Sequence, residues 1–121
     1  MKPGPKADRV LLQHMCECLA RVKEYTNHER ERFYGSRLVQ DGVIRNLQTL
    51  AESSQRLSAD VKATEPSIPW RDLSGFRNVI VHGYLGTDLD AIWLMVAQDL
   101  PPLTEALNRM LSRLSPDIPR V

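Results

Sequence analysis

The feature that most constrains the fold of this chain is an apolar repeat with the period of an α-helix. Between residues 8 and 25, apolar side chains recur at steps of three or four, which places them on one face of a helix. The members of this first stripe are Leu11, Met15, Cys18, Val22 and Tyr25. A second stripe predicts one long helix from about residue 37 to residue 63. Its members are Val39, Val43, Leu47, Leu50, Leu57 and Val61.

Proline, glycine and capping residues mark further predicted helices. A short helical turn is expected around residues 30–34. The stretch TEPSIPW at 64–70 contains two prolines, so a third helix is expected from about residue 69 to residue 81. A fourth helix follows, with Thr87 or Asp88 as the residue that accepts a hydrogen bond from its first free N–H groups.

Pro101 and Pro102 fall inside the apolar stripe of the fourth helix and predict a kink or a restart there, because proline has no N–H to donate. The predicted fold is all-α: an up-down helical bundle of four to five helices around one core, with a Pro-broken last helix. Residues 1–7 are expected to be a flexible N-terminal arm, residues 8–114 the single helical domain, and residues 115–121 a C-terminal tail.

The composition excludes several classes of protein. The chain has 121 residues, 26% of them charged, and a net charge of only +1, so no strong overall field attracts nucleic acid. Its two cysteines, Cys16 and Cys18, are too close in sequence for a disulfide between them to stabilise the fold. A second pair of zinc ligands is missing as well. The sequence shows neither a signal peptide nor an apolar run of roughly 18 residues. We therefore expect a cytoplasmic protein without a membrane partner.

One stretch, RNVIVHGY at residues 77–84, combines three β-branched residues with several polar ones. Its middle favours a strand by propensity, but a lone strand among helices has no partner for its backbone hydrogen bonds. We therefore predict that it forms the end of the third helix. Asn78 and His82 then lie one turn apart, and the side chain of Arg77 is long enough to reach the same site.

These polar groups suit chemistry on a phosphodiester. His82 titrates near neutral pH and can accept a proton from a 2′-hydroxyl or donate one to a leaving oxygen. Arg77 can hold the phosphate and stabilise its developing charge, and Asn78 can orient the imidazole. The carboxylate cluster that Mg²⁺ prefers is missing, so no metal is expected. From spacing alone, the commoner roles stay open: a surface ion pair for Arg77 and a helix C-cap for His82.

The same stretch resembles the R-x4-H-x-Y motif of the HEPN superfamily, in its branch of HepT-like ribonuclease toxins. Other pieces of the sequence match in the same order: D-G-V-I-R-N-L at 41–47, I-P-W-R at 68–71, G-F-R-N at 75–78 and D-L-P-P-L at 99–103. The ordered set spans about residues 8 to 114. Together with the terminal Tyr84, it is more specific than an R-x4-H spacing alone.

The resemblance implies a helical homodimer in which the R-x4-H helices of two protomers face each other across a shared cleft. The implied activity is metal-independent endoribonuclease cleavage of RNA, with tRNA as a candidate target. Arg77 and His82 match the catalytic pair, with Asn78 as the supporting polar residue. Tyr84 matches the tyrosine to which a cognate antitoxin, a minimal nucleotidyltransferase, attaches AMP from ATP. The chain itself then needs no cofactor.

Two other functions are compatible with the same resemblance. In the first, the chain is a non-catalytic HEPN module that binds the nucleotidyltransferase or RNA, which its near-neutral net charge favours. In the second, the chain is the antitoxin that restrains a toxic nucleotidyltransferase. Cleavage of RNA by the purified chain tests the first alternative, and expression of each gene alone tests the second.

Some positions depart from the family pattern or have two readings. Gly42 stands where alanine is common and weakens the second helix by up to about 1 kcal/mol. Gln48 stands where an acidic residue is common, so an ion pair between protomers there is in doubt. Asp41, Arg45 and Asn46 are expected either at a dimer face or RNA groove, or in polar contacts within their own helix.

Other polar and aromatic features are expected to be structural. Trp70 and Trp93 lie within apolar stripes, so we interpret them as core anchors rather than as platforms for stacked bases. His14 and the E-R-E-R run at residues 29–32 are expected on solvated helix faces.

Overall fold

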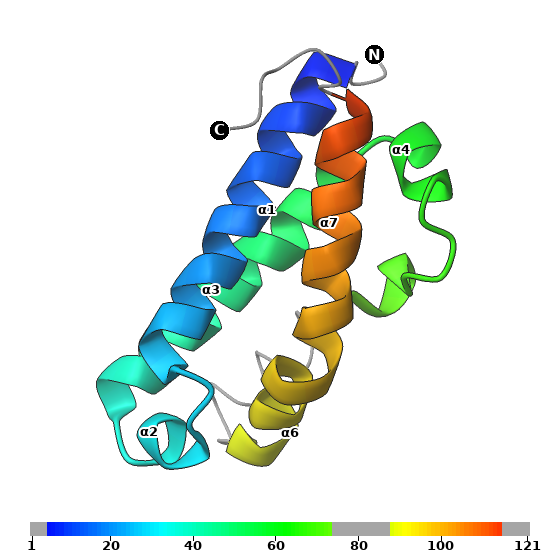
Figure 1. Cartoon of the computed structure of the whole chain (residues 1–121). Coiled ribbons are helices and arrows are strands. Elements are labelled where there is room, and N and C mark those ends of the chain that lie inside the picture. Colours follow the sequence, from blue (N-terminus) through cyan, green and yellow to red (C-terminus); the bar gives the residue numbers. More distant parts are fainter. Residues whose placement is uncertain (1–4, 74–87, 115–121) are drawn as a thin grey trace.

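The computed structural model describes residues 5–73 and 88–114 of the chain, and every regular element in these two ranges is a helix (Figure 1). In chain order the elements are α1 (Pro5–Thr26), α2 (Arg30–Tyr34), α3 (Arg37–Arg56), α4 (Ala59–Ala63), α6 (Leu89–Leu94), the π-helix η1 (Met95–Asp99) and α7 (Leu100–Leu114). The all-α prediction is confirmed for this part of the chain, and the homodimer stays a prediction. Among the helices described, none has the length and apolar character needed to cross a bilayer.

The core lies among the three longest helices. α1 packs along α3 and along α7, and the short α2 packs against one end of α1, α3 and α6 (Figure 1). The predicted stripe of α3 is buried from Val43 onward, and Cys18 of the α1 stripe is buried as well. Met15 and Val22 of the α1 stripe are buried as predicted, whereas Leu11 is only partly buried and its neighbour Leu12 is fully buried instead.

α1 also begins earlier than predicted, at Pro5 instead of Asp8. Residues 5–7 of the expected flexible arm are therefore helical. Proline is compatible with this position, because the N–H groups of a first helical turn have no partner within the helix.

The predicted helix over residues 37–63 is two helices. α3 ends at Arg56, and α4 begins after Ser58, whose hydroxyl accepts a hydrogen bond from the Val61 N–H at 3.2 Å. The buried Asp8 carboxylate accepts hydrogen bonds from the Ser58 N–H at 2.9 Å and from its hydroxyl at 2.7 Å. In an uninterrupted helix this N–H would bond the carbonyl four residues earlier. Because Asp8 takes it instead, the single-helix prediction was wrong.

The predicted interruption at Pro101 and Pro102 is confirmed, and it takes the form of a π-helix. Neither proline has an N–H, so the α-helical ladder cannot run unchanged through the preceding turn. There the Leu100 N–H bonds the Met95 carbonyl, five residues earlier, at the end of η1. Both prolines then lie in the first turn of α7.

Gly42, a departure from the family pattern, has a packing role. A Cβ at this position would lie 2.9 Å from ring atoms of Tyr25, so the missing side chain lets the tyrosine ring lie directly against α3. The amide of the buried Asn46 donates a hydrogen bond to the Gly42 carbonyl at 2.8 Å. Of the two readings for Asn46, the structure therefore supports a polar contact within its own helix.

Candidate functional site

The predicted site residues Arg77, Asn78, His82 and Tyr84 lie outside the described residues, in the range 74–87. The structure describes the chain on either side of that range and the faces of the long helices. These parts show how the flanks of the predicted site are held and which polar groups are free to meet a ligand.

The N-terminal flank is a helical turn at residues 70–73 that is fixed to the loop after α4. The indole N–H of Trp70 donates to the carbonyls of Lys62 and Glu65, at 3.1 and 3.2 Å. Trp70 is also partly buried against the core, and Leu73 is buried. The prediction that Trp70 is a core anchor is therefore confirmed.

The loop that carries this flank is tied to α7 by a buried carboxylate. Glu65 is only 5% exposed, and its oxygens lie 2.7 Å from Arg109 Nη2 and 2.7 Å from Arg113 Nη1. The hydrogen bond from Arg109 lowers the pKa of Glu65, and that from Arg113 adds to the shift, whereas burial opposes it. This contact was not predicted from the sequence. The i,i+4 spacing of the two arginines is visible in the sequence, but their partner is 44 and 48 residues away.

The C-terminal flank is held by α6 and its contacts with α2. Asp88 is the N-cap of α6 and accepts a hydrogen bond from the Ala91 N–H at 3.1 Å, as one of the two predicted caps. Trp93 stacks on the fully buried Phe33 with ring centroids 5.5 Å apart, which confirms its predicted role in the core. Both flanks of residues 74–87 are thus anchored to the bundle, at different helices.

A second contact between α2 and α6 involves a tyrosine. The Tyr34 hydroxyl donates a hydrogen bond to the Asp90 carboxylate, and this bond is the main reason that the pKa of Tyr34 is raised. The Arg30 guanidinium lies 4.9 Å from the centre of the same ring. Residues 29–32 are exposed, as predicted for this charged run.

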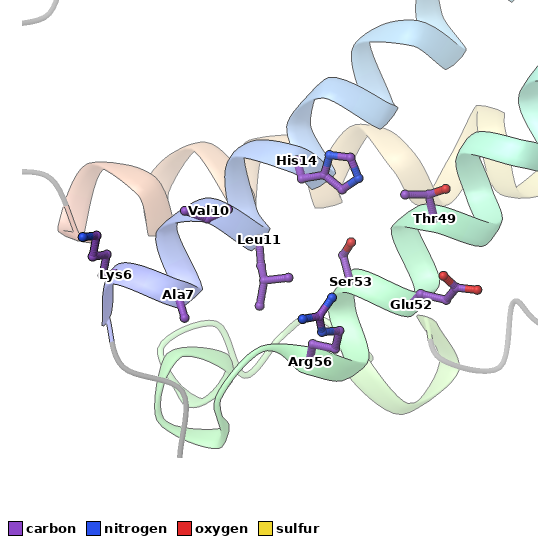
Figure 2. Close-up of a pocket in the computed structure, with 9 residues that line it drawn as sticks. All are labelled: Lys6, Ala7, Val10, Leu11, His14, Thr49, Glu52, Ser53 and Arg56. Atoms are coloured by element: carbon purple, nitrogen blue, oxygen red, sulfur yellow. The ribbon is translucent and has the colours of Figure 1, made fainter. Parts of the chain in front are cut away.

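A groove of about 1000 Å³ lies between the first half of α1 and the second half of α3 (Figure 2). Its lining combines three basic side chains and one carboxylate with apolar and hydroxyl groups: Lys6, Ala7, Val10, Leu11, His14, Thr49, Glu52, Ser53 and Arg56. His14 is exposed, as predicted, but its position beside α3 was not predicted. We name this hollow the α1–α3 groove.

Other candidate residues on α3 stay open. Asp41 and Arg45 are exposed, so a role at a dimer face or in RNA binding is available to them, unlike Asn46. Within the described ranges, no three His, Cys, Asp or Glu side chains are placed to share a metal ion. The predicted metal independence concerns residues 74–87 as well and stays a prediction.

Comparison with known families assigns this helical chain to a class of nucleases. The model of the HepT-like family, described as "Ribonuclease HepT-like", matches residues 15–110. The chain therefore belongs to the HepT-like ribonuclease family, which confirms the resemblance. No solved structure is significantly similar to the chain.

Named relatives agree with this assignment. The chain is 32% identical over 100 residues to "Probable ribonuclease HepT" of Thermococcus cleftensis, a match that covers 82% of this chain and 91% of the relative. It is 28% identical over 101 residues to "Putative RNase MJ1380" of Methanocaldococcus jannaschii, covering 83% and 93%. It is also 29% identical over 107 residues to "Gamma-glutamylcyclotransferase and putative RNase MJ0434" of the same organism. That match covers 88% of this chain but only 48% of the longer relative.

Proposed function

We propose that this chain is a metal-independent endoribonuclease, the toxin of a toxin–antitoxin pair, with its site in the cleft of a homodimer. The observation that carries the proposal is the R-x4-H-x-Y stretch at residues 77–84 in a chain of the HepT-like ribonuclease family. The names of the relatives support nuclease chemistry. RNA is the proposed substrate, with tRNA as a candidate.

In the proposed reaction, a base removes the proton from a ribose 2′-hydroxyl and the oxygen attacks the adjacent phosphorus. The 5′-oxygen then leaves with a proton from an acid. His82 carries out one of these proton transfers, Arg77 stabilises the charge on the phosphate oxygens, and Asn78 orients the imidazole. The second protomer of a homodimer would bring a second copy of these groups to the same cleft.

The proposed control of this activity is AMPylation of Tyr84 by a nucleotidyltransferase antitoxin that uses ATP. Each attached AMP adds a negative phosphate two residues from His82, where it competes with RNA for the same cationic groups. Intact-mass measurement of the chain co-expressed with its partner tests this step. Mass increments of AMP that map to Tyr84 are expected, and an unmodified tyrosine in an inactive complex would contradict it.

The nuclease itself is tested with purified protein and RNA in the presence of EDTA. Wild-type protein should cleave, and Arg77→Ala and His82→Ala should each slow cleavage by at least about 100-fold, because each removes a group that acts on the reacting atoms. Arg32→Ala, on the exposed face of α2, is the matched control and should cleave normally. Undiminished cleavage by both site variants, with normal circular dichroism, would overturn the proposal.

A second candidate function is a non-catalytic module that binds the nucleotidyltransferase. The net charge of +1 favours it, since affinity for RNA must then come from a local group of cations. Tight binding of the partner, no RNA cleavage and no growth arrest on expression would support this alternative over the nuclease.

A further inference from the structure

The α1–α3 groove contains polar groups that the fold itself does not use. Three hydroxyl side chains lie on this part of α3. Thr49 donates to the Arg45 carbonyl at 3.1 Å, and Ser54 donates to the Ala51 carbonyl at 2.7 Å. Ser53 as a residue is only 6% exposed. Its hydroxyl bonds no group of the described residues, but the oxygen itself is not buried. Figure 2 shows this hydroxyl pointing into the space between the two helices, toward His14.

The arginine of the groove is also without an internal partner. Arg109 and Arg113 are paired with Glu65, but Arg56 forms no ion pair with any side chain in residues 5–73 or 88–114. Glu52 lies one turn before Arg56 on α3, and Figure 2 shows its carboxylate turned away from α1 while the Arg56 guanidinium is turned toward α1. A guanidinium and a hydroxyl thus face the same space. Lys6 lines the groove from the other helix, and Figure 2 shows its ammonium turned away from Ser53 and Arg56. This donor set suits an oxyanion.

Three apolar side chains line the α1 side of the groove. Val10 is 57% exposed although it is a large hydrophobic residue, and it lies beside Ala7 and the partly buried Leu11. A free inorganic anion would leave this surface in water. A phosphodiester would cover it, because its phosphate is joined to sugars and bases with apolar faces.

We propose that the α1–α3 groove binds a phosphodiester of the RNA strand. Arg56 and Ser53 donate hydrogen bonds to the phosphate oxygens, Lys6 adds positive charge at the edge of the groove, and Val10 contacts the adjoining sugar or base. His14 lines the groove, and its Nδ1 lies 3.8 Å from the Glu17 carboxylate. The inference rests on the proposed nuclease function, because it names a binding surface for that same substrate.

The test is binding of a fluorescently labelled single-stranded oligonucleotide, 2′-O-methylated throughout so that no 2′-hydroxyl can attack. Anisotropy titrations with the full chain at several salt concentrations give the affinity and its salt dependence. Arg56→Gln should weaken binding about ten-fold at low salt and reduce the slope of log K against log salt by about 1. Ser53→Ala should weaken binding about three-fold, as expected for the net loss of one ordinary hydrogen bond.

Arg21→Gln is the matched control, because it removes the same charge from an exposed position on α1 outside the groove. It should change the affinity less than two-fold. Equal losses for Arg56→Gln and Arg21→Gln would overturn the inference, since binding would then follow net charge. Equal affinity of the wild-type protein for the oligonucleotide and for inorganic phosphate would overturn it too, leaving only a generic anion site.

Two further results separate the groove from the nuclease and from self-association. Cleavage of natural RNA by the wild type, with unchanged oligonucleotide binding by Arg56→Gln, would reject the groove and keep the nuclease. Absence of cleavage with the predicted loss of binding would keep the groove and reject the nuclease. Val10→Glu should weaken binding without changing the mass measured by sedimentation. A change in that mass with unchanged binding would assign the groove to contact between copies of the chain and overturn the inference.

Discussion

The same two helices meet in two different ways along their length. At the packed end, defined by Tyr25, Gly42 and Asn46, the tyrosine ring lies on a residue without a side chain and the buried amide bonds its own helix. At the open end, the α1–α3 groove leaves a hydroxyl and an arginine without partners among the described residues. At the packed end the buried amide of Asn46 has a partner within its own helix, whereas Ser53 and Arg56 at the open end are available to a ligand.

The largest expected loss of stability comes from breaking the contact between Asp8 and Ser58, which lies at the open end. Asp8→Ala removes the acceptor of two hydrogen bonds from Ser58. The Ser58 N–H is then left without its partner, so the variant should lose about 3 kcal/mol of unfolding free energy. Urea denaturation followed by circular dichroism measures this. Asp41→Ala, an exposed aspartate on α3, is the control, and an equal loss in both variants would show that the Asp8 contact does not hold the helix break.

The next effect tests the packed end. Gly42→Leu places a side chain where the Tyr25 ring lies and should cost about 2 kcal/mol through overpacking. Combining it with Tyr25→Ala should recover part of that loss, because the two residues occupy the same space. Thermal or urea unfolding of the two single variants and the double variant gives the coupling. Strictly additive losses would mean that the two helices do not meet closely at this point.

A third prediction concerns the ion pairs between Glu65 and the two arginines of α7. Glu65→Gln should cost about 1.5 kcal/mol at pH 7, because it weakens the charged bonds to Arg109 and Arg113. The pKa of Glu65 is lowered in the folded state. Its contribution is therefore complete above the ordinary glutamate pKa and is lost as the pH falls through the lower folded value.

Urea titrations of the wild type and Glu65→Gln between pH 7 and pH 3 check this dependence. The difference between them should be constant down to about pH 5 and shrink below the ordinary glutamate pKa of about 4.3. Glu31→Gln, on the exposed face of α2, should show no such dependence. A difference that grows toward acid would contradict the assignment.

The smallest effect is expected at the open end itself. Arg56→Gln and Ser53→Ala should each change the unfolding free energy by no more than about 0.5 kcal/mol, because neither side chain bonds another described residue. The same urea experiments measure it. If either variant lost more than about 1 kcal/mol of unfolding free energy, that residue would have a structural role rather than a ligand-binding one.

Local patterns predicted much of this fold, and contacts between distant residues account for the errors. The apolar stripes of α1 and α3, the Asp88 cap and the disturbance at Pro101 all follow from spacing over a few residues. The break after Arg56 does not, because its cause, Asp8, is 50 residues from Ser58 in sequence.

The residues of the candidate site were identified from the sequence rather than from the described structure. The R-x4-H-x-Y stretch and its family can be read directly from residues 77–84, which lie outside the described ranges. The core position of Trp93 was predicted, but the contact of Glu65 with α7, the stacking of Trp93 on Phe33 and the α1–α3 groove could not be. Each depends on side chains brought together from helices far apart in the chain.

The π-helix before Pro101 also changes the phase of the last helix. A π-type turn holds one residue more than an α-helical turn, which rotates everything after it by roughly 100° about the axis. Trp93, before η1, stacks on Phe33 of α2, whereas the buried Leu107, after it, belongs to the helix that packs on α1. The consecutive helices α6, η1 and α7 therefore direct their apolar faces toward two different partners. Deleting a single residue within Met95–Asp99 would align those faces and leave one of them without a partner.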